Sequence, residues 1–321
     1  MVEMPTLQKK KLAWTTILTD PSYVEGAMVL AHSLHATNSE FPLVVMVTDR
    51  IGPEDRKRIE QSSPMAQTRV IASFRPKPGT TSNYASPQFL EAWTKLRVFE
   101  MVEYDYVACL DCDMLVISNL DYVLIDAQAT IRHASKWDGT MHSNTVHMMA
   151  VHACVCNPLK KEQYPSWWNP GNCAYSSGRS PQDRIAPSSQ LQDIDILDID
   201  ISSAELPCRY INGGMFVISP NLAMAEALTS LVYQIEDLTS FQFAEQDFLS
   251  RVFRDHWRAL PLAANFLKTA LVSHPSLYQL DKIDNIHYIM TKPWNVSPSD
   301  EPDLFFEMYE LWWASRKELC D

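Results

Sequence analysis

The sequence lacks any continuous apolar run long enough to cross a bilayer. A membrane-spanning helix needs roughly 18 to 20 consecutive apolar residues, and no run in this chain approaches that length. The amino end, MVEMPTLQKKKLAW, also lacks the apolar core of a secretory signal. We therefore expect a cytoplasmic protein without a membrane span.

Positive charge is also scarce. The chain has 27 Lys and Arg residues against 39 Asp and Glu residues, which gives a formal net charge of −12 and a pI near 5.2. Phosphate groups would be repelled over most of such a surface, so nucleic acid and anionic membranes are not expected as partners. A phosphate-bearing ligand would need a cation in its own pocket.

The cysteines do not form an even, regularly spaced set. Seven of them are scattered along the chain, and this favours reduced thiols over a disulfide framework. Four fall within one region and are candidates for a zinc site: Cys154, Cys156, Cys173 and Cys208. A C-x-C pair with such wide remaining spacing matches a zinc ribbon poorly, so buried free thiols are the preferred interpretation.

The sequence does contain strands and helices in alternation. With 321 residues, 46% of them hydrophobic, the chain can bury a sizeable core. Apolar periodicity predicts strands over residues 11–19, 42–49, 68–74, 106–110 and 209–221. It predicts helices over residues 23–36, 52–61, 86–105 and 243–253. This alternation indicates an α/β protein with a mostly parallel central sheet.

Two carboxylates follow the strongly apolar strand YVACL. Asp111 and Asp113 leave its carboxyl end, which is where open α/β sheets place their ligands. Because the chain turns there, both side chains can reach one hard divalent cation, directly or through a bound ligand. The alternative is a surface turn capped by aspartates, since D-x-D alone is a weak signal.

Two polar motifs follow in the second half. The strand RYINGGMFVISPN carries Asn212, whose amide can bond sugar hydroxyls, and a Gly-Gly pair that lets backbone approach a ligand. The pair can equally mark a β-bulge. The helix in FAEQDFLSRVF begins with Glu-Gln-Asp, which the helix dipole favours without any function.

A third motif, IDNIHYIMTKPWNV, brings His287 and Lys292 close to a proline turn. His287 can complete the ligand set of a metal, and Lys292 can neutralise a phosphate. Lys292 would then be a cation of the kind that a phosphate ligand needs in this acidic protein.

Together the ordered motifs resemble glycosyltransferase family 8, the retaining enzymes that include glycogenin and galactinol synthase. The resemblance covers nearly the whole chain, and FAEQDFLSRVFRDHW and HPSLYQLDKIDNIHY are most similar to the galactinol synthase branch. It implies a GT-A type Rossmann-like nucleotide-diphospho-sugar transferase fold, as one domain over residues 1–321. Residues 137–208 would then be an acceptor-side insertion.

The resemblance also implies roles for residues at matching positions. The cofactor would be Mn²⁺ or another divalent cation, bound by Asp111, Asp113 and His287. Gln246 would lie beside the anomeric carbon, flanked by Glu245 and Asp247. A UDP-sugar donor would be bound by these residues: Leu18, Thr19, Asp20, Tyr23, Lys95, Asp111, Cys112, Asn212, Gly213, Gly214 and Lys292.

The expected activity is retaining transfer of a hexose, from UDP-glucose or UDP-galactose to a small polyol or sugar. Two alternatives stay open: a glycogenin-like self-glucosylating enzyme, for which Tyr278 is the nearest tyrosine, and a non-catalytic nucleotide-sugar-binding protein. A homodimer is possible in any of these cases. Trp167 and Trp168 can stack on an acceptor ring or can pin the insertion to the core. The loop before Lys292 departs from the family pattern, because Met290 stands where a Gly is usual and the loop is one residue shorter.

Overall fold

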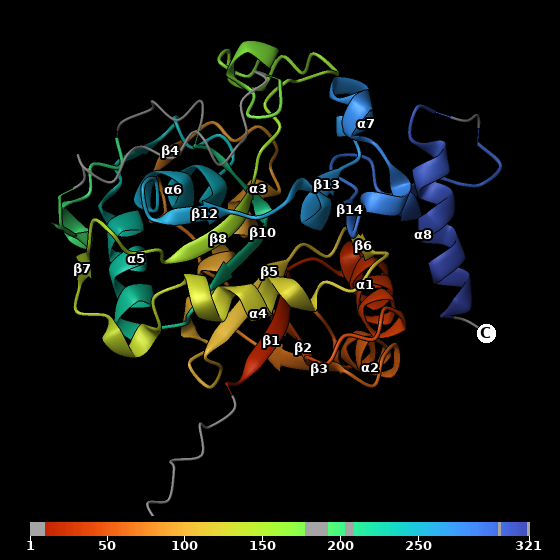
Figure 1. Ribbon diagram of the computed structural model, residues 1–321, viewed down its shortest axis with the longest axis horizontal. Helices are drawn as coiled ribbons and strands as arrows, with labels where there is room; N and C mark the ends of the chain where they lie inside the picture. Colours follow the sequence, from red (N-terminus) through yellow and green to blue (C-terminus); the bar gives the residue numbers. More distant parts are fainter. Residues whose placement is uncertain (1–9, 177–191, 203–208, 301–302, 320–321) are drawn as a thin grey trace, which may run out of the picture.

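A seven-stranded sheet forms the centre of the molecule (Figure 1). The computed structural model describes residues 10–176, 192–202, 209–300 and 303–319. The strand order is β12-β8-β10-β5-β1-β2-β3. Strand β10 is antiparallel to both of its neighbours and every other pair is parallel. The mostly parallel α/β architecture predicted from the sequence is confirmed.

The strands of this sheet are β1 (Leu12–Leu18), β2 (Leu43–Val47), β3 (Ala66–Val70), β5 (Tyr106–Leu110), β8 (Met148–His152), β10 (Ile211–Ile218) and β12 (Trp257–Ala259). The helices are α1 (Val24–Ala36), α2 (Pro53–Gln61), α3 (Phe89–Ala92), α4 (Asp121–Thr130), α5 (Leu222–Gln234), α6 (Glu245–Val252), α7 (Ala270–Ser273) and α8 (Phe306–Glu318). Among the described residues, no helix has the length and apolar character needed to cross a membrane.

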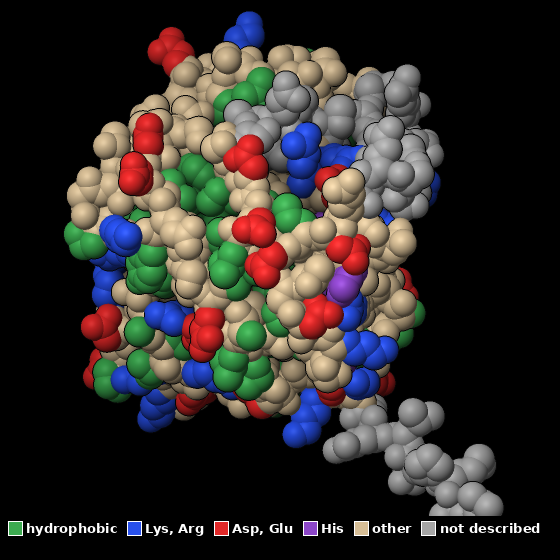
Figure 2. Space-filling view, turned by 90° about the vertical axis from the view of Figure 1, so that its left-hand side faces the viewer, with side chains coloured by type: hydrophobic (Ala, Val, Ile, Leu, Met, Phe, Trp, Pro, Cys, Tyr) green, Lys and Arg blue, Asp and Glu red, His purple; other side chains and the backbone are tan. Residues whose placement is uncertain are grey.

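Helices cover both faces of the sheet, because alternate side chains of each strand point to opposite sides. Trp14 of β1 packs with α1, α2 and α4 on one face. Its neighbour Ala13 packs with α5, α6 and the segment before β5 on the other. Figure 2 shows the side of the molecule that carries α5 and β7 (Thr140–Met141), where acidic side chains are interspersed with basic ones.

A smaller sheet lies next to the central sheet, at the turn that carries Asp111 and Asp113. Strand β6 (Met114–Val116) follows Asp113 directly and pairs with β14 (Asn285–His287), which also pairs with β13 (Phe266–Leu267). Met114 is opposite His287 in this antiparallel register. Helix α8 covers this sheet, at the right of Figure 1, and buries Tyr309 and Trp312 against it. The turn between β5 and β6 is therefore held between two sheets.

The long helix predicted over residues 86–105 is wrong. The structure has the short helix α3 and then a 3-10 segment over Trp93–Glu100, which ends before Met101. With three residues per turn, side chains three apart share one face, and Trp93, Leu96 and Phe99 are all buried in the core. Spacing of three, and not 3.6, was the signal in the sequence.

The segment 137–208 contributes one strand, β8, to the central sheet. Its strand β8 lies between β12 and β10, and its residues are fully buried. Farther along, β7 pairs with β9 (Ile194–Asp195). The remaining two-stranded sheet joins β4 (Thr81–Ser82) to β11 (Asp237–Leu238).

Candidate functional site

A cavity of about 760 Å³ opens at the carboxyl ends of β1 and β5. Its volume is in the range of small-molecule sites, roughly 300 to 1,000 Å³. The site residues predicted from the sequence line this cavity, with the exception of Asp247. The tertiary structure therefore brings together segments that are far apart in the chain.

Each of the two strand-end aspartates contacts a lysine with one carboxylate oxygen and faces His287 with the other. Asp111 Oδ1 lies 2.7 Å from Lys95 Nζ, and its Oδ2 lies 3.7 Å from His287 Nε2. Asp113 Oδ2 pairs with Lys292 Nζ, and its Oδ1 lies 3.3 Å from His287 Nε2. One oxygen of each carboxylate thus faces the same imidazole nitrogen.

This arrangement suits a hard divalent cation. The ligand atoms of Asp111, Asp113 and His287 lie within 4.8 Å of one another, and two carboxylate oxygens with one imidazole are a normal set for manganese-type ions. Burial opposes the charge of Asp113, but the neighbouring ammonium group of Lys292 holds the pKa of this carboxyl below its ordinary value. Asp113 is therefore an anion at neutral pH, as a metal ligand must be.

A buried amide orients the histidine. His287 Nδ1 lies 3.0 Å from Asn265 Oδ1, and a carboxamide oxygen can only accept, so Nδ1 donates this bond and Nε2 is the nitrogen directed at the carboxylates. Asn265 Nδ2 donates to Asn212 Oδ1 at 2.8 Å. Asn265 is not indicated by the sequence, since nothing in PLAANFLK distinguishes it.

Lys95 connects three parts of the cavity wall. Its Nζ lies 2.9 Å from Glu245 Oε1 and donates to the carbonyl of Gly213 at 3.0 Å, in addition to its pair with Asp111. Burial works against the lysine charge, but Asp111 and Glu245 raise the pKa of Lys95 well above its ordinary value. Lys95 is thus a permanent cation in the cavity of an acidic protein.

The Gln246 side chain is held at both ends of its amide. Oε1 accepts from the backbone N–H of Gly213 at 2.8 Å, and Nε2 donates to Tyr210 Oη at 2.9 Å. Tyr210 in turn donates to Asp247 Oδ1 at 2.8 Å. The chain Gln246–Tyr210–Asp247 therefore fixes the glutamine rather than leaving it mobile.

Asp247 lies behind the cavity wall, and its second oxygen supports the turn before α6. Oδ2 accepts from the N–H of Phe243 at 2.7 Å. This bond stabilises a turn in which Ala244 has φ 49° and ψ −117°, a conformation that non-glycine residues rarely adopt. Asp247 is buried, and burial raises its pKa to about 6. The pKa of Glu245 is raised by burial to about 7.

The turn after β1 forms the opposite end of the cavity. Asp20 Oδ1 accepts from the N–H of Ser22 at 3.0 Å, and its Oδ2 lies 2.6 Å from Arg50 Nη2. The Tyr23 ring lies 5.6 Å from Lys292 Nζ and packs edge-on against Trp294. Leu18 points its side chain into the core, so its backbone is the part that reaches the cavity.

Cys112 sits between the two aspartates but turns its thiol inward. The Sγ atom lies 3.1 Å from Thr16 Oγ1 and 3.3 Å from the carbonyl of Ile17. Burial raises the pKa of this thiol to about 12. The side chain of Cys112 therefore anchors the turn to β1.

Gly214 is required by the packing of His287. A Cβ atom at this position would lie 2.3 Å from His287 Cε1 and 2.9 Å from Asn212 Oδ1. The backbone carbonyl of Gly214 also accepts from the N–H of Asp111 at 2.9 Å. The pairing of β10 with β8 is irregular here, which agrees with the expected β-bulge, and the group that approaches Gly214 closely is the His287 ring.

The loop before Lys292 carries backbone strain. Met290 has φ 67°, a left-handed conformation that costs roughly 1–2 kcal/mol for a residue other than glycine. The loop still brings Lys292 Nζ to Asp113 and to the carbonyl of Tyr288, 3.1 Å away. Buried Lys268, another residue that the sequence did not indicate, donates to the carbonyl of Thr291 at 2.6 Å and supports the loop.

The two tryptophans of the 137–208 segment pack against the protein. Trp168 stacks on Phe243 at a centroid distance of 4.6 Å and also lines the cavity. Trp167 meets Tyr210 edge-on at 5.2 Å. Both contacts favour the interpretation that these rings pin the segment to the core. Tyr278 packs against Phe266, 5.9 Å between ring centroids, and does not line the cavity.

Comparison with protein families and relatives identifies similar proteins. The model of the family described as glycosyl transferase family 8 matches residues 198–297. Galactinol synthase 6 of Arabidopsis thaliana is 29% identical over 296 residues, covering 91% of this chain and 75% of the relative. Galactinol synthase 1 of Solanum lycopersicum is 26% identical over 299 residues, covering 92% and 78%.

Solved structures share the fold at lower sequence identity. A galactosyltransferase, LgtC, in complex with donor and acceptor sugar analogs has a TM-score of 0.53 at 15% identity, covering 96% of both chains. The apo form of the glycosyltransferase GlyE of Streptococcus pneumoniae has a TM-score of 0.54 at 15% identity, covering 96% of this chain and 60% of its own. The central sheet is thus that of a GT-A glycosyltransferase fold.

Substitution of Gly214 tests the geometry of the cation site. In Gly214→Ala the new methyl group must displace His287, so we expect the affinity for Mn²⁺ to fall by roughly 10- to 100-fold, as for disturbed ligand orientation elsewhere. Isothermal titration with MnCl₂ measures this. Gly52→Ala is the control, because a Cβ at Gly52 meets no atom within 4 Å. Unchanged Mn²⁺ affinity in Gly214→Ala would contradict the assignment.

The raised pKa of Asp247 predicts that the stability of the protein depends on pH. Its pKa is about 6 in the folded chain and 3.8 ordinarily, so between pH 4 and 6 the folded state holds a proton that the unfolded state has lost. The contribution of Asp247 to the free energy of unfolding therefore falls as the pH rises through this interval. Relative to the wild type, Asp247→Asn should gain about 2 kcal/mol of unfolding free energy between pH 4 and pH 7.

Urea unfolding of both proteins at the two pH values measures this difference. Asp126→Asn, on the exposed side of α4, is the control and should show no such gain. A constant difference between Asp247→Asn and wild type across the interval would show that folding does not raise the pKa of Asp247.

Proposed function

Since the chain is a hexosyltransferase of glycosyltransferase family 8, similar to the galactinol synthases, we propose that it transfers a hexose from a UDP-sugar to a hydroxyl group of a small polyol or sugar, with a divalent cation. The donor would be UDP-glucose or UDP-galactose, and the cation Mn²⁺. Transfer would retain the anomeric configuration.

One observation carries this proposal: two carboxylates, one imidazole and two lysines converge in one cavity of a protein with net charge −12. A diphosphate is the kind of ligand that such a set suits. The cation would bind to Asp111, Asp113 and His287, and Lys95 and Lys292 would approach the phosphate oxygens from either side. The acidic surface then does not prevent phosphate binding, because the cations are local.

The donor would lie along the cavity. The turn of Leu18, Thr19, Asp20 and Tyr23 is the proposed uridine end, where the Tyr23 ring can stack on the base. Asn212 and the backbone at Gly213 and Gly214 would contact the donor sugar. Cys112 would contribute its backbone, since its thiol is bonded to Thr16.

The chemistry needs stabilisation of the leaving group. When the bond to the anomeric carbon breaks, negative charge develops on the leaving phosphate oxygen, and a bound cation would stabilise it electrostatically. Lys292 is buried beside Asp113 and is placed to share this charge. A buried lysine interacts more strongly with a nearby negative charge than a lysine in water does.

The tethered Gln246 favours a reaction without a covalent sugar intermediate. An amide is a poor nucleophile, and both ends of this one are engaged by Gly213 and Tyr210. Asp247 lies outside the cavity lining, and Glu245 is paired with Lys95. We assign Gln246 to holding the anomeric face, Glu245 to placing Lys95, and Asp247 to supporting the turn before α6. The leaving phosphate oxygen would then take the proton of the acceptor hydroxyl on the same face.

The acceptor would enter on the side of the 137–208 segment. Tyr164, Lys161 and Trp168 line this end of the cavity. They present aromatic and cationic groups, which suit sugar and polyol hydroxyls better than an apolar acceptor.

Calorimetric titration with UDP tests the cation site. We expect Mn²⁺ to strengthen UDP binding by at least about tenfold, which corresponds to about 1.4 kcal/mol. Asp111→Asn and Asp113→Asn should lose this gain and keep the weak metal-free binding, whereas Asp126→Asn should behave as wild type. Tight UDP binding that ignores Mn²⁺, or a preference for a purine nucleotide, would contradict the donor assignment.

A product assay tests the transfer itself. Enzyme, Mn²⁺ and each UDP-sugar are incubated with a panel of polyols, sugars and glycans, and the products are analysed by mass and by NMR of the new linkage. We expect a one-hexose gain with α configuration on a small acceptor. Gln246→Ala should lower the turnover by roughly 100-fold, with a much smaller change in UDP affinity.

Three outcomes would overturn the proposal. A hexose gain on the protein itself that disappears in Tyr278→Phe would favour self-glucosylation. A β-linked product would reject the retaining mechanism. UDP-sugar binding with no product from any acceptor would favour a nucleotide-sugar-binding protein.

A further inference from the structure

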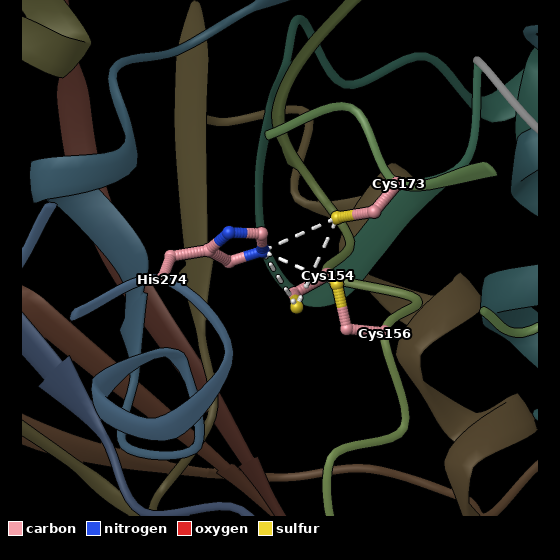
Figure 3. Close-up of side chains that lie close together, drawn as sticks. All are labelled: Cys154, Cys156, Cys173 and His274. Carbon is pink, nitrogen blue, oxygen red and sulfur yellow. Dashed lines mark hydrogen bonds between the residues drawn. The ribbon is translucent and has the colours of Figure 1, made fainter. Parts of the chain in front are cut away.

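A second cluster of metal-ligating side chains lies apart from the carboxylates. Cys154 and Cys156 follow strand β8, Cys173 follows a 3-10 turn at Pro170–Asn172, and His274 follows α7. Figure 3 shows the three thiols and the Nε2 atom of His274 directed toward one another. Segments from two distant parts of the chain therefore meet at these four side chains.

The distances in the cluster fit one tetrahedral ion. His274 Nε2 lies 3.4 Å from each of the three Sγ atoms, and Cys154 Sγ lies 3.9 Å from Cys173 Sγ. With Zn–S of about 2.3 Å and Zn–N of about 2.0 Å, a tetrahedron has S···N edges of about 3.5 Å and S···S edges of about 3.8 Å. The cluster already has nearly this size.

The surroundings are those of a closed structural site. All four residues are buried, and they lie among Ala153, Val155, Tyr210 and Leu267. Two hydroxyl groups contact the sulfur atoms: Ser273 Oγ lies 3.3 Å from Cys154 and Ser176 Oγ lies 3.3 Å from Cys156. Such hydroxyls can donate to metal-bound thiolates.

We propose that Cys154, Cys156, Cys173 and His274 bind one structural zinc ion. Three thiolates and one imidazole complete a tetrahedron and leave no open position for substrate or water. The set is soft, in contrast to Asp111, Asp113 and His287, so the two sites select different metals. The proposal does not depend on the transferase activity.

The zinc ion would fix the wall of the cavity. Cys156 and Cys173 close the loop 157–172, which carries Tyr164 and Trp168 to the cavity lining. His274 would tie this loop to the segment that contains β13 and α7, where Leu267 and Thr269 line the same cavity. One ion would thus join two walls of the cavity.

The sequence alone favours free thiols, because a C-x-C pair with wide remaining spacing matches a zinc ribbon poorly. Cys208, the fourth candidate ligand in the sequence, lies outside the described residues. His274 supplies the fourth ligand through tertiary contact. A disulfide between Cys154 and Cys173 is the competing arrangement. It would require the two sulfur atoms, now 3.9 Å apart, to approach to about 2.05 Å.

Metal analysis of the whole chain tests the proposal. The protein is produced with a metal-free affinity tag in zinc-supplemented medium, treated with EDTA and desalted, and its zinc is measured by plasma mass spectrometry. We expect about one zinc per chain, and less than about 0.2 in Cys173→Ser and His274→Ala. Cys109→Ala, which removes a buried thiol of β5, is the matched control and should keep its zinc.

A cobalt measurement keeps the test independent of mutant folding. Wild-type protein produced in zinc-depleted, cobalt-supplemented medium should show the intense visible bands of tetrahedral cobalt together with thiolate-to-cobalt charge transfer. Asp113→Asn should keep both the zinc and the spectrum, which separates this site from the carboxylate site.

Three results would overturn the proposal. Wild-type protein without zinc whose cysteines all titrate as thiols would establish free thiols. A mass lower by two hydrogens would establish a disulfide. Zinc that is lost in Asp113→Asn but kept in Cys173→Ser would place the ion among the carboxylates.

Discussion

The cavity of this protein depends on two carboxylates, Asp111 and Asp113. Each of them pairs with a lysine through one oxygen and faces His287 with the other. Burying an isolated charge costs several kcal/mol, yet Asp113, Glu245 and Lys292 are all buried here. They are tolerated because Lys95 and Lys292 neutralise one oxygen of each strand-end aspartate, and the second oxygens are left facing His287. The same pairing that makes burial possible leaves acceptor atoms directed at one point.

The fold holds this arrangement through backbone register rather than through the charges alone. The chain leaves β5 with Asp111 and enters β6 after Asp113, and β6 places Met114 opposite His287. The N–H of Tyr288 donates to the carbonyl of Asp113 at 2.8 Å. Asn265 and the absence of a side chain at Gly214 then fix the imidazole ring. Packing of α8 on the small sheet holds these parts together.

Two of the strained turns lie directly before residues that line the cavity. Ala244 precedes the Glu-Gln-Asp helix and Met290 precedes Lys292, and both have positive φ. Such conformations persist only where surrounding contacts determine them. Here Asp247 bonds Phe243, and Lys268 bonds Thr291. In each case a buried side chain behind the cavity, Asp247 or Lys268, supports a turn, and the residues that follow the turn line the cavity. The side chains that position the turn are therefore not the ones that line the cavity.

The sequence by itself determined the α/β class, β1, α1, α2, β5 and α6, because apolar periodicity and first-turn acids are local properties. It also indicated the strand-end aspartates, and the family resemblance pointed to some of the other residues that line the cavity. Only the tertiary structure decided which of them meet. Asn265, Lys268 and His274 act through partners far away in the chain, so no spacing in the sequence could indicate them. The 3-10 segment at Trp93–Glu100 was missed for a related reason: burial of side chains three residues apart in the core overrides the helix pattern that the local composition favours.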